Sequence, residues 1–372
     1  MIFSQSEYKA RLDRVRSAMR ERNIDLLIVD QSEFLIYLTG FSISENMYRA
    51  CLVPLEGEPV MVLRAVDLGP FEDSSWITKA VSFADWEDPI LVMANTITQL
   101  GHSARNVGLD EDSYCMPLRR FKHLQAALPD ASFVDFSGVL EVLRATKSPA
   151  EIELLRKASR IGDLGIEAAV ADAGEGRSAR DAAAVVHQVF MENGADTSRA
   201  GIITAGVGDN FLHGYMTGDP LQKGQILHLE LLPFVQGYSA RIMRPVVIGP
   251  ADERAKTAEM LLQIQDEQFA AMKPGVPAKE IDAIAREKLL AAGLRKDYLN
   301  ITGYNLGLYP IHTPRTSDFS RIFLPTSTWL LEPGMVFHMY VSASGVAFSE
   351  TILITEDGAE RLTLAPRKLF EA

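Results

Sequence analysis

The sequence predicts an α/β protein of two domains, and three features of the chain lead to this prediction. Strand and helix signals alternate along residues 1–143, which we expect to form the first domain. A polar segment follows, and a long amphipathic helix begins the second domain, residues 144–372. Within that domain one helix-led pattern occurs twice. A chain of 372 residues is long enough to form a hydrophobic core in each domain.

The first domain begins with a predicted helix and continues with strands. Ser4-x-x-Glu7 is a capping box, and apolar residues at helical spacing follow it as far as Arg22. Residues 25–29 form an apolar run typical of a buried strand. Residues 52–63 contain two apolar runs around Glu-Gly-Glu, which predicts a hairpin. These alternating signals favour a small α/β domain.

The boundary between the domains is predicted at the polar segment of residues 144–149. This segment ends with Pro149, a residue that suits the first turn of a helix. From residue 150 onwards apolar side chains recur at helical spacing, as in a helix with one buried face.

The second domain contains an internal repeat. A helical pattern that starts after Gly176 stops at Gly194, and a similar pattern starts 99 positions later, after Gly275, and stops at Gly293. A strand-rich segment with a Gly-rich turn follows each pattern. We expect two related helix-plus-hairpin halves around a pseudo-twofold axis. A chance similarity between two amphipathic helices is the alternative.

The composition restricts the possible classes of function. Hydrophobic residues make up 47% of the chain and charged residues 23%, as in a globular protein, and no apolar run could span a bilayer. The start of the chain does not resemble a signal peptide, and two cysteines cannot form a disulfide framework, so we expect a cytoplasmic protein. A net charge of -12 argues against a nucleic-acid partner.

Several motifs of the second domain are specific in combination. In chain order they are Gly224-Gln225-Ile226-Leu227-His228-Leu229-Glu230, Gly237-Tyr238, Arg244, Gly303-Tyr304-Asn305-Leu306-Gly307, Leu331-Glu332-Pro333-Gly334-Met335 and the run from Thr351 to Gly358. Their order and spacing resemble the creatinase, aminopeptidase P and prolidase family, and the resemblance covers nearly the whole chain. It implies a small creatinase-type amino-terminal domain, a pita-bread α/β domain with an internal pseudo-twofold repeat, and a homodimer.

Metallopeptidase members of this family bind two divalent metals through two Asp, one His and two Glu. The resemblance places these ligand positions on Glu230, Arg241, Tyr304, Tyr340 and Ser349. A metal pair requires converging anionic oxygens and an imidazole, whereas an arginine carries a permanent positive charge. We therefore expect a metal-independent protein without a cofactor. A register slipped by one residue is the alternative, and it would make Glu350 a second retained carboxylate.

The resemblance also predicts a function. Residues 349–355 and 366–370 are similar to the carboxy terminus of ectoine hydrolase, and creatinase and ectoine hydrolase form the most similar branch. The leading hypothesis is hydrolysis of a C–N bond in a cyclic amidine, amidine or amide of a small carboxylated metabolite. The alternatives are a metallopeptidase of the Xaa-Pro aminopeptidase or dipeptidase type, and a non-catalytic binding protein on a degenerate peptidase fold.

His213 is the first candidate for a catalytic role. It lies 11 residues before Gly224, where the resemblance places an active-site histidine. An imidazole can accept and return a proton at cellular pH, as cleavage of a C–N bond requires. A structural loop histidine is the alternative.

Glu230 and Arg241 are candidates that we consider together. In a strand, Glu230 points to the same face as His228, and the resemblance implies that this face is the pocket. Glu230 is predicted to act as nucleophile, as base or as partner of a substrate cation, and Arg241 to bind a substrate carboxylate. A buried ion pair between the two is the alternative.

The resemblance also implies roles for further residues, but these roles are less specific. Glu350 is a third catalytic candidate, and a solvated strand residue is its alternative. The predicted substrate-binding residues are His312, His338, Tyr304 and Tyr340. Structural histidines are the alternative for the two imidazoles.

Arg49 is the one candidate in the first domain. It follows Leu38-Thr39-Gly40-Phe41 at a place where creatinase-like proteins carry an arginine toward the pocket of the partner subunit. A guanidinium there would bind a substrate carboxylate through two hydrogen bonds. A surface salt bridge is the alternative.

Overall fold

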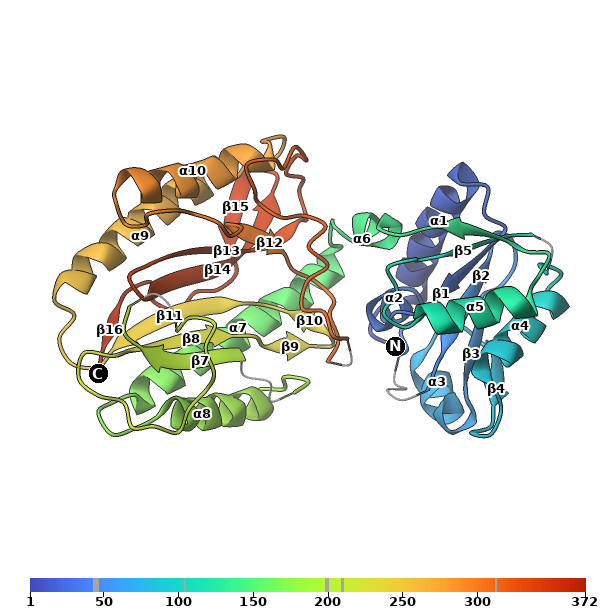
Figure 1. Ribbon diagram of the computed structural model, residues 1–372, viewed down its shortest axis with the longest axis horizontal. Helices are drawn as coiled ribbons and strands as arrows, with labels where there is room; N and C mark the ends of the chain where they lie inside the picture. Colours follow the sequence, from blue (N-terminus) through green and yellow to red (C-terminus); the bar gives the residue numbers. More distant parts are fainter. Residues whose placement is uncertain (43–46, 104, 198–200, 209–210, 312) are drawn as a thin grey trace. The chain divides into compact units, whose positions relative to one another are not determined.

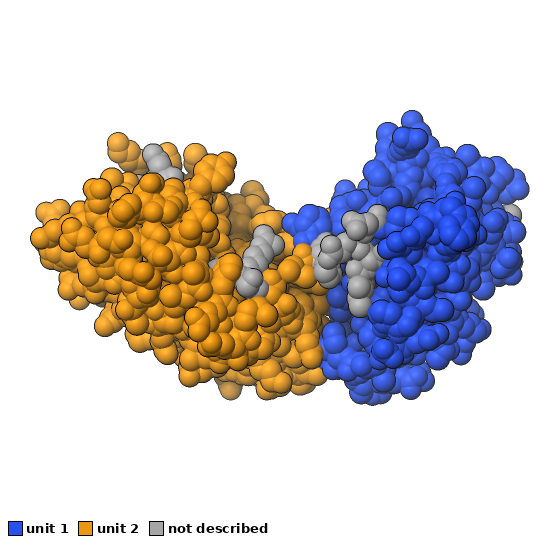
Figure 2. Space-filling view, turned by 90° about the horizontal axis from the view of Figure 1, so that it is seen from below, with its two compact units in different colours: residues 1–144, 312–314 blue, residues 145–311, 315–372 orange. Residues whose placement is uncertain are grey.

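A computed structural model describes residues 1–42, 47–103, 105–197, 201–208, 211–311 and 313–372. The chain divides into two compact units (Figure 2). Unit 1 comprises Met1–Arg144 together with Thr313 and Pro314, and unit 2 comprises Ala145–Ile311 and Arg315–Ala372. The division falls one residue after the boundary expected between residues 143 and 144. No helix in the described ranges combines the length and the apolar character needed to cross a membrane.

The described part of unit 1 contains a mixed sheet with the strand order β4-β3-β2-β1-β5-β6 (Figure 1). Its strands are β1 (Leu26–Val29), β2 (Ala50–Pro54), β3 (Val60–Arg64), β4 (Lys79–Phe83), β5 (Asn106–Leu109) and β6 (Ser132–Asp135). Strand β2 pairs antiparallel with β1 and β3, so the predicted hairpin is β2–β3. The other pairs are parallel.

Helices pack around the sheet of unit 1. They are α1 (Gln5–Glu21), α2 (Ser32–Thr39), α3 (Leu68–Ser74), α4 (Pro89–Gln99), α5 (Leu118–Ala127) and α6 (Val139–Leu143), with a 3-10 turn at Ala65–Asp67. Helix α1 begins at the predicted capping box, because the hydroxyl of Ser4 accepts a hydrogen bond from the backbone N–H of Glu7. Residues such as Leu52, Val107 and Leu124 form a buried core beneath the helices.

Unit 2 contains a second mixed sheet, in which the order of strands is β12-β13-β14-β11-β8-β7, while β15 pairs with β14 and β16 with β11. The strands are β7 (Gly201–Gly206), β8 (Ile226–Leu231), β11 (Ile242–Val247), β12 (Gly303–Asn305), β13 (Val336–Ala343), β14 (Val346–Thr355), β15 (Gly358–Arg361) and β16 (Phe370–Glu371). A short hairpin, β9 (Phe234–Val235) with β10 (Tyr238–Ser239), lies between β8 and β11 in the chain.

The two halves of unit 2 have the same order of elements. Helices α7 (Pro149–Asp172) and α8 (Ala179–Glu192) precede β7, β8 and β11, and helices α9 (Glu253–Ala271) and α10 (Ala278–Ala291) precede β12, β13 and β14. Gly176 and Gly275, the glycines of the repeat, both have left-handed backbone conformations, with φ of 85° and 84°. Glycine adopts this conformation without strain, which explains its place at both helix starts. The predicted α/β fold class is confirmed.

The two faces of this sheet carry different side chains. Helix α7 lies so close to β8 that a Cβ on Gly165 would come within 2.9 Å of the Leu231 side chain. Leu229 and Leu231 therefore face the helices, and by the alternation of a strand His228 and Glu230 face the other side. The polar residues of the candidate site lie on this second face.

Candidate active site

Neighbouring strands bring polar side chains together on the face of the sheet away from the helices. Glu230 on β8 is directly opposite Met243 on β11. On β13, His338 is opposite Tyr304 of β12, and Tyr340 is opposite Ser349 of β14. Residues that are far apart in sequence become cross-strand neighbours in this way.

Two adjoining cavities in unit 2 open onto this face. The first has a volume of about 360 Å³ and the second about 370 Å³. His213, Glu230, Met243 and Tyr340 line both cavities. The first is also lined by Leu212, His228, Arg295, Asn300, Ser342 and Ala347. The second is also lined by Gly201, Ile202, Leu232, Arg241, Ile301, Tyr304, Thr316, Phe319 and His338.

Glu230 lies at the junction of the two cavities and is 2% exposed. Its Oε1 accepts a hydrogen bond of 3.0 Å from Nη1 of Arg241. Its Oε2 has no hydrogen-bond partner among the described residues and lies 3.9 Å from Nε2 of His228. Burial raises the pKa of Glu230, but His228, Arg241 and His338 together outweigh burial and lower that pKa to about 2. The carboxylate is therefore ionised at neutral pH.

His228 and His338 are two buried imidazoles beside this carboxylate. Neither ring nitrogen of either histidine has a hydrogen-bond partner within the described ranges. Burial, together with the positive charge of Arg241, lowers the pKa of His338 to about 3 against the opposing effect of Glu230, so this ring is neutral at neutral pH. Buried polar atoms are rarely left without partners, and those that are mark places where a ligand or water binds.

Arg241 and two tyrosines form one wall of the second cavity. The guanidinium of Arg241 lies 5.3 Å from the centroid of the Tyr304 ring. Burial raises the pKa of Tyr304 more than Arg241 lowers it, and burial raises the pKa of Tyr340 to about 12. The Tyr340 hydroxyl accepts a hydrogen bond of 3.3 Å from Asn300. Both phenols are therefore protonated at neutral pH and offer rings and hydroxyl groups to a ligand.

The structure brings together six of the residues named from the sequence. These residues line one or both cavities and are His213, Glu230, Arg241, Tyr304, His338 and Tyr340. His213 is exposed and lies in the segment after β7. The pairing of Glu230 with Arg241, the alternative considered above, is present in the structure.

Other cavity residues were missed by the sequence analysis as site residues. His228 could have been included, because it lies two positions from Glu230 on the same strand and so on the same face. Arg295 and Asn300 lie in the connection between α10 and β12, where no periodicity indicates the direction of a side chain.

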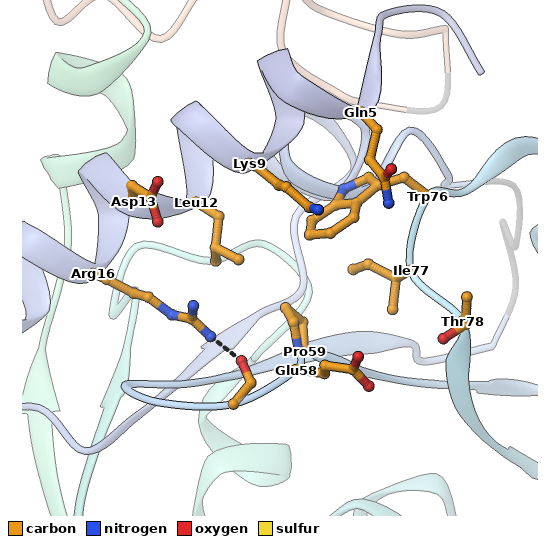
Figure 3. A pocket seen from close by; sticks show the side chains of 11 residues that line it. Gln5, Lys9, Leu12, Asp13, Arg16, Glu58, Pro59, Trp76, Ile77 and Thr78 are labelled. Atoms are coloured by element: carbon orange, nitrogen blue, oxygen red, sulfur yellow. Dashed lines mark hydrogen bonds between the residues drawn. The ribbon is translucent and has the colours of Figure 1, made fainter.

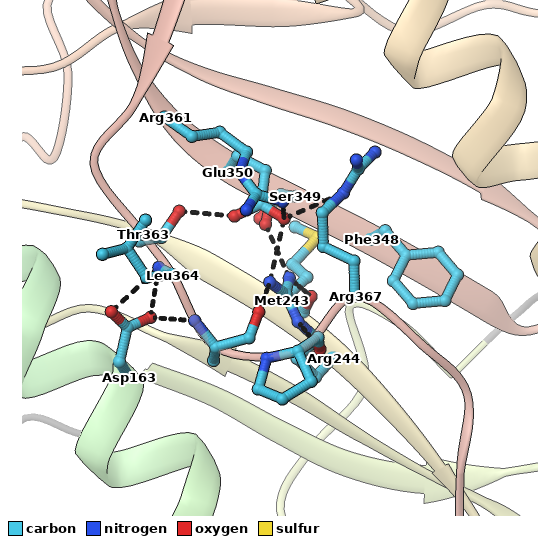
Figure 4. Close-up of polar contacts among 12 residues, drawn as sticks. Asp163, Met243, Arg244, Phe348, Ser349, Glu350, Arg361, Thr363, Leu364 and Arg367 are labelled. Carbon is cyan, nitrogen blue, oxygen red and sulfur yellow. Dashed lines mark hydrogen bonds and ion pairs between the residues drawn. The ribbon is translucent and has the colours of Figure 1, made fainter.

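Glu350 is not brought to the cavities. It lies on the helix side of β14, opposite the core residue Met339, and is fully buried. It accepts a hydrogen bond of 2.9 Å from Arg244 and another from the hydroxyl of Thr363 (Figure 4). Its neighbour Ser349 is the residue in register with Met243 and Tyr340. The predicted catalytic role of Glu350 therefore has no support from its position.

Arg49 and His312 are not placed at this site either. In unit 1 the guanidinium of Arg49 is buried and donates hydrogen bonds to the hydroxyls of Ser32 and Ser42. Its predicted reach into a partner subunit stays a prediction. His312 lies outside the described residues.

Unit 1 contains a separate cavity of about 320 Å³ (Figure 3). Helix α1 and the β2–β3 turn supply much of its lining, together with Trp76, Ile77 and Thr78. None of the residues named from the sequence as site residues lines it.

The metal pair implied by the family resemblance can be tested against these residues. Within the described ranges, no group of three or more His, Cys, Asp or Glu side chains is arranged to hold a metal ion. At the second expected ligand position the guanidinium of Arg241 donates to Glu230, and tyrosines stand at two others. A guanidinium keeps its charge in proteins and repels a dication. The donor set in this site does not fit two divalent ions.

Comparisons with known proteins place the whole chain among related hydrolases. It is 28% identical to an Xaa-Pro dipeptidase of Pyrococcus furiosus over 97% of this chain and 100% of the relative. It is 29% identical to an ectoine hydrolase of Halomonas elongata over 99% of this chain and 98% of that protein. The crystal structure of the prolidase from Pyrococcus horikoshii OT3 has the same fold, with a TM-score of 0.82 at 24% identity over 97% and 100% of the two chains.

Two family descriptions match the chain. Residues 11–146 match the creatinase/prolidase N-terminal domain, and residues 153–356 match metallopeptidase family M24. The expectation of a metal-independent protein is contradicted by this finding, because the matching family is one of metallopeptidases and a similar full-length protein is named an Xaa-Pro dipeptidase. The resemblance read from the motifs is confirmed: the chain belongs to metallopeptidase family M24, an enzyme family whose members hydrolyse C–N bonds.

Proposed function

We propose that the protein hydrolyses a C–N bond in a small carboxylated molecule at the face of unit 2 that carries Glu230. The observation that supports this proposal most directly is the ionised carboxylate of Glu230, one oxygen of which has no partner among the described residues, next to two buried imidazoles that also have none there. Such an unfilled set of polar atoms lining a cavity is suited to bind a polar substrate and an attacking water.

The pKa of Glu230 separates the roles considered for it. A general base works best when its pKa is near the working pH. A carboxylate with a pKa of about 2 is too weak a base to take a proton from water at neutral pH. Glu230 therefore acts through its charge: Oε2 holds the attacking water or a positively charged substrate group, and stabilises a neighbouring imidazolium.

The proton transfers then fall to an imidazole that lines the cavities. His213 lines both of them and is exposed to water. In the proposed reaction His213 takes a proton from water as the oxygen attacks the carbon of the C–N bond. The imidazolium returns the proton to the leaving nitrogen as the C–N bond breaks.

A second candidate is the hydrolysis of Xaa-Pro dipeptides. It is favoured by the similarity to an Xaa-Pro dipeptidase along nearly the full length of both chains. Hydrolysis of a cyclic amidine is favoured by the equally extensive similarity to an ectoine hydrolase. Both candidates require a small substrate and the same cavities.

The test is an assay of the purified protein against Xaa-Pro dipeptides and against ectoine and other cyclic amidines, with and without added divalent metal. We expect hydrolysis of one class, measured by mass spectrometry of the products, and a loss of at least about 100-fold in rate for Glu230→Gln, as for removal of one electrostatic group from an active site. Glu259→Gln is the matched control, because Glu259 is exposed on α9 and lines neither cavity. A wild-type rate in Glu230→Gln would contradict the proposal.

The homodimer and the cytoplasmic location expected from the sequence stay predictions. Light scattering coupled to size-exclusion chromatography tests the first. A mass near 82 kDa, twice the 41.0 kDa of the chain, would support a dimer.

A further inference from the structure

Two arginines, Arg295 and Arg241, line the cavities, and they differ in whether an acidic side chain neutralises their charge. It is half-buried, and it lines the first cavity together with His213, His228 and Glu230. Arg241, in the second cavity, is neutralised by its ion pair with Glu230. Among the described residues no acidic side chain forms an ion pair with Arg295. Among the described residues that line the first cavity, Arg295 is therefore a cation whose charge no ion pair neutralises.

An aromatic ring holds this guanidinium in place. It lies 4.3 Å from the centroid of Tyr298, a residue that is 7% exposed. A second guanidinium, that of Arg286, lies 4.7 Å from the same ring, and it is bound by both carboxylate oxygens of Asp282 at 2.7 and 2.8 Å. Two arginines thus contact one tyrosine, and within the described part of the chain Arg286 has an acidic partner whereas Arg295 has none.

No hydrogen bond joins the Arg295 guanidinium to another described residue, so its N–H donors remain available beside the contact with Tyr298. A guanidinium that contacts a ring through its face keeps its N–H donors in its own plane, where they match the two oxygens of a carboxylate. The aromatic contact also restricts the side chain before a ligand binds, which reduces the entropy lost on binding. Asn300, on the same cavity wall, adds an amide to this polar end.

The second cavity has a different character. Beyond the polar residues near Glu230 its lining includes the side chains of Ile202, Leu232, Ile301 and Phe319 and the ring of Tyr304. The two cavities meet at His213, Glu230, Met243 and Tyr340. A molecule that occupies both therefore has one anionic end and one apolar end, with the residues of the proposed reaction between them.

We infer that Arg295 binds the carboxylate of the substrate in the first cavity, while the second cavity receives the apolar ring or side chain on the other side of the reacting carbon. The position of the reacting carbon rests on the proposed function. The binding of a carboxylate by Arg295 does not.

The test uses two ligands that contain no C–N bond, cyclohexanecarboxylate and the neutral cyclohexylmethanol. Calorimetric titration of the full-length protein is expected to show tighter binding of the carboxylate, by about 10- to 100-fold, as for a charge-assisted pair of hydrogen bonds. In Arg295→Gln this preference is expected to fall to within about twofold. Lys296→Gln is the matched control, because it removes an equal charge at the next residue, which is exposed and lines neither cavity.

Three outcomes would overturn the inference: no preference in the wild-type protein, a preference that survives Arg295→Gln, or an equal loss in Lys296→Gln. Melting curves of the variants show whether each is folded, and Arg295→Lys is a second variant that keeps the charge and removes the two-donor edge. We expect Arg295→Lys to retain part of the preference. If the preference follows Arg295 but no C–N bond is cleaved in any assay, the proposed function fails and this inference stands.

Discussion

Two arginine–glutamate pairs lie on opposite faces of the same sheet, and their hydrogen bonding differs. On the helix-covered face, Arg244 donates to Glu350 and also to the backbone carbonyls of Met243, Ser349, Ala365 and Pro366 (Figure 4). On the cavity face, Arg241 donates to Glu230 at 3.0 Å. There Nε of Arg241 and Oε2 of Glu230 have no partner among the described residues.

The comparison separates a structural ion pair from a pair available for function. Arg244 and Glu350 use their hydrogen-bonding atoms to connect β11, β14 and the carboxy-terminal residues, and both side chains are fully buried. Arg241 and Glu230 leave atoms unused, and those atoms face a cavity. Both pairs join a guanidinium to a carboxylate below the surface, and the completeness of hydrogen bonding distinguishes them.

The largest effect on stability is expected at the structural pair. Glu350→Ala removes the carboxylate that accepts hydrogen bonds from Arg244 and Thr363 and leaves the buried guanidinium unpaired beside a void, which costs about 3–5 kcal/mol. In a domain of this size the melting temperature should fall by about 6–20 °C, and calorimetry measures this. A decrease of less than about 1 kcal/mol in the free energy of unfolding would show that the backbone carbonyls alone are sufficient to stabilise the buried guanidinium of Arg244.

A smaller loss of stability is expected at the cavity pair. Glu230→Gln leaves Arg241 unpaired beside a cavity that water can enter, so we expect a cost of about 1–3 kcal/mol in urea unfolding. The double variant Glu230→Gln/Arg241→Gln should recover most of this stability without recovering hydrolysis. If it recovers activity instead, the pair is structural like the first.

Lowering the pH should change the contributions of Glu230 and Glu350 to the free energy of unfolding in opposite directions, because their pKa values are shifted in opposite directions. The pKa of Glu230 is lowered from 4.5 to about 2, so the stability that it contributes is present above pH 4.5 and lost as the pH falls toward 2. Wild type should lose about 2 kcal/mol more than Glu230→Gln between pH 5 and 3.

Glu350 should behave in the opposite way. Burial raises its pKa more than Arg244 and Thr363 lower it, so the stability linked to this shift is present below pH 4.5 and lost as the pH rises through the folded-state pKa. Comparison of Glu350→Gln with wild type across the same pH series tests this sign. If the free energy of unfolding depended on pH in the same way in Glu230→Gln and Glu350→Gln, the difference proposed between the two carboxylates would be contradicted.

The smallest effect is expected for an ion pair at the surface. Arg156 donates to both oxygens of Glu360 at 2.5 and 2.8 Å, and the exposed fractions of these side chains are 39% and 40%. Its hydrogen bonds are as short as those of the buried pairs, but the surrounding water screens the attraction between the two charges. Arg156→Gln should therefore change the free energy of unfolding by no more than about 1 kcal/mol, and a loss as large as that of Glu350→Ala would contradict the role assigned to burial.

Particular residues show how far the sequence could be interpreted. The motifs predicted that Glu230, Arg241, Tyr304 and Tyr340 lie in one site, because these residues occupy positions at which the family has ligands of one metal pair. The catalytic assignment of Glu350 neglected strand alternation. With Ser349 at the expected ligand position, the next residue on the strand must face the other way.

The sequence by itself determined the helices, the strands and the repeated order of elements, because capping residues, glycines and hydrophobic periodicity act over a few neighbouring residues. It also determined the family, through motifs that recur in order. Only the tertiary structure decided which arginine has an acidic partner, because Glu230 lies on β8 and Arg241 lies in the connection before β11, while Arg295 lies in a connection without periodicity. Charge pairing depends on strand register and on the path of connections, and both are set by packing across the whole unit.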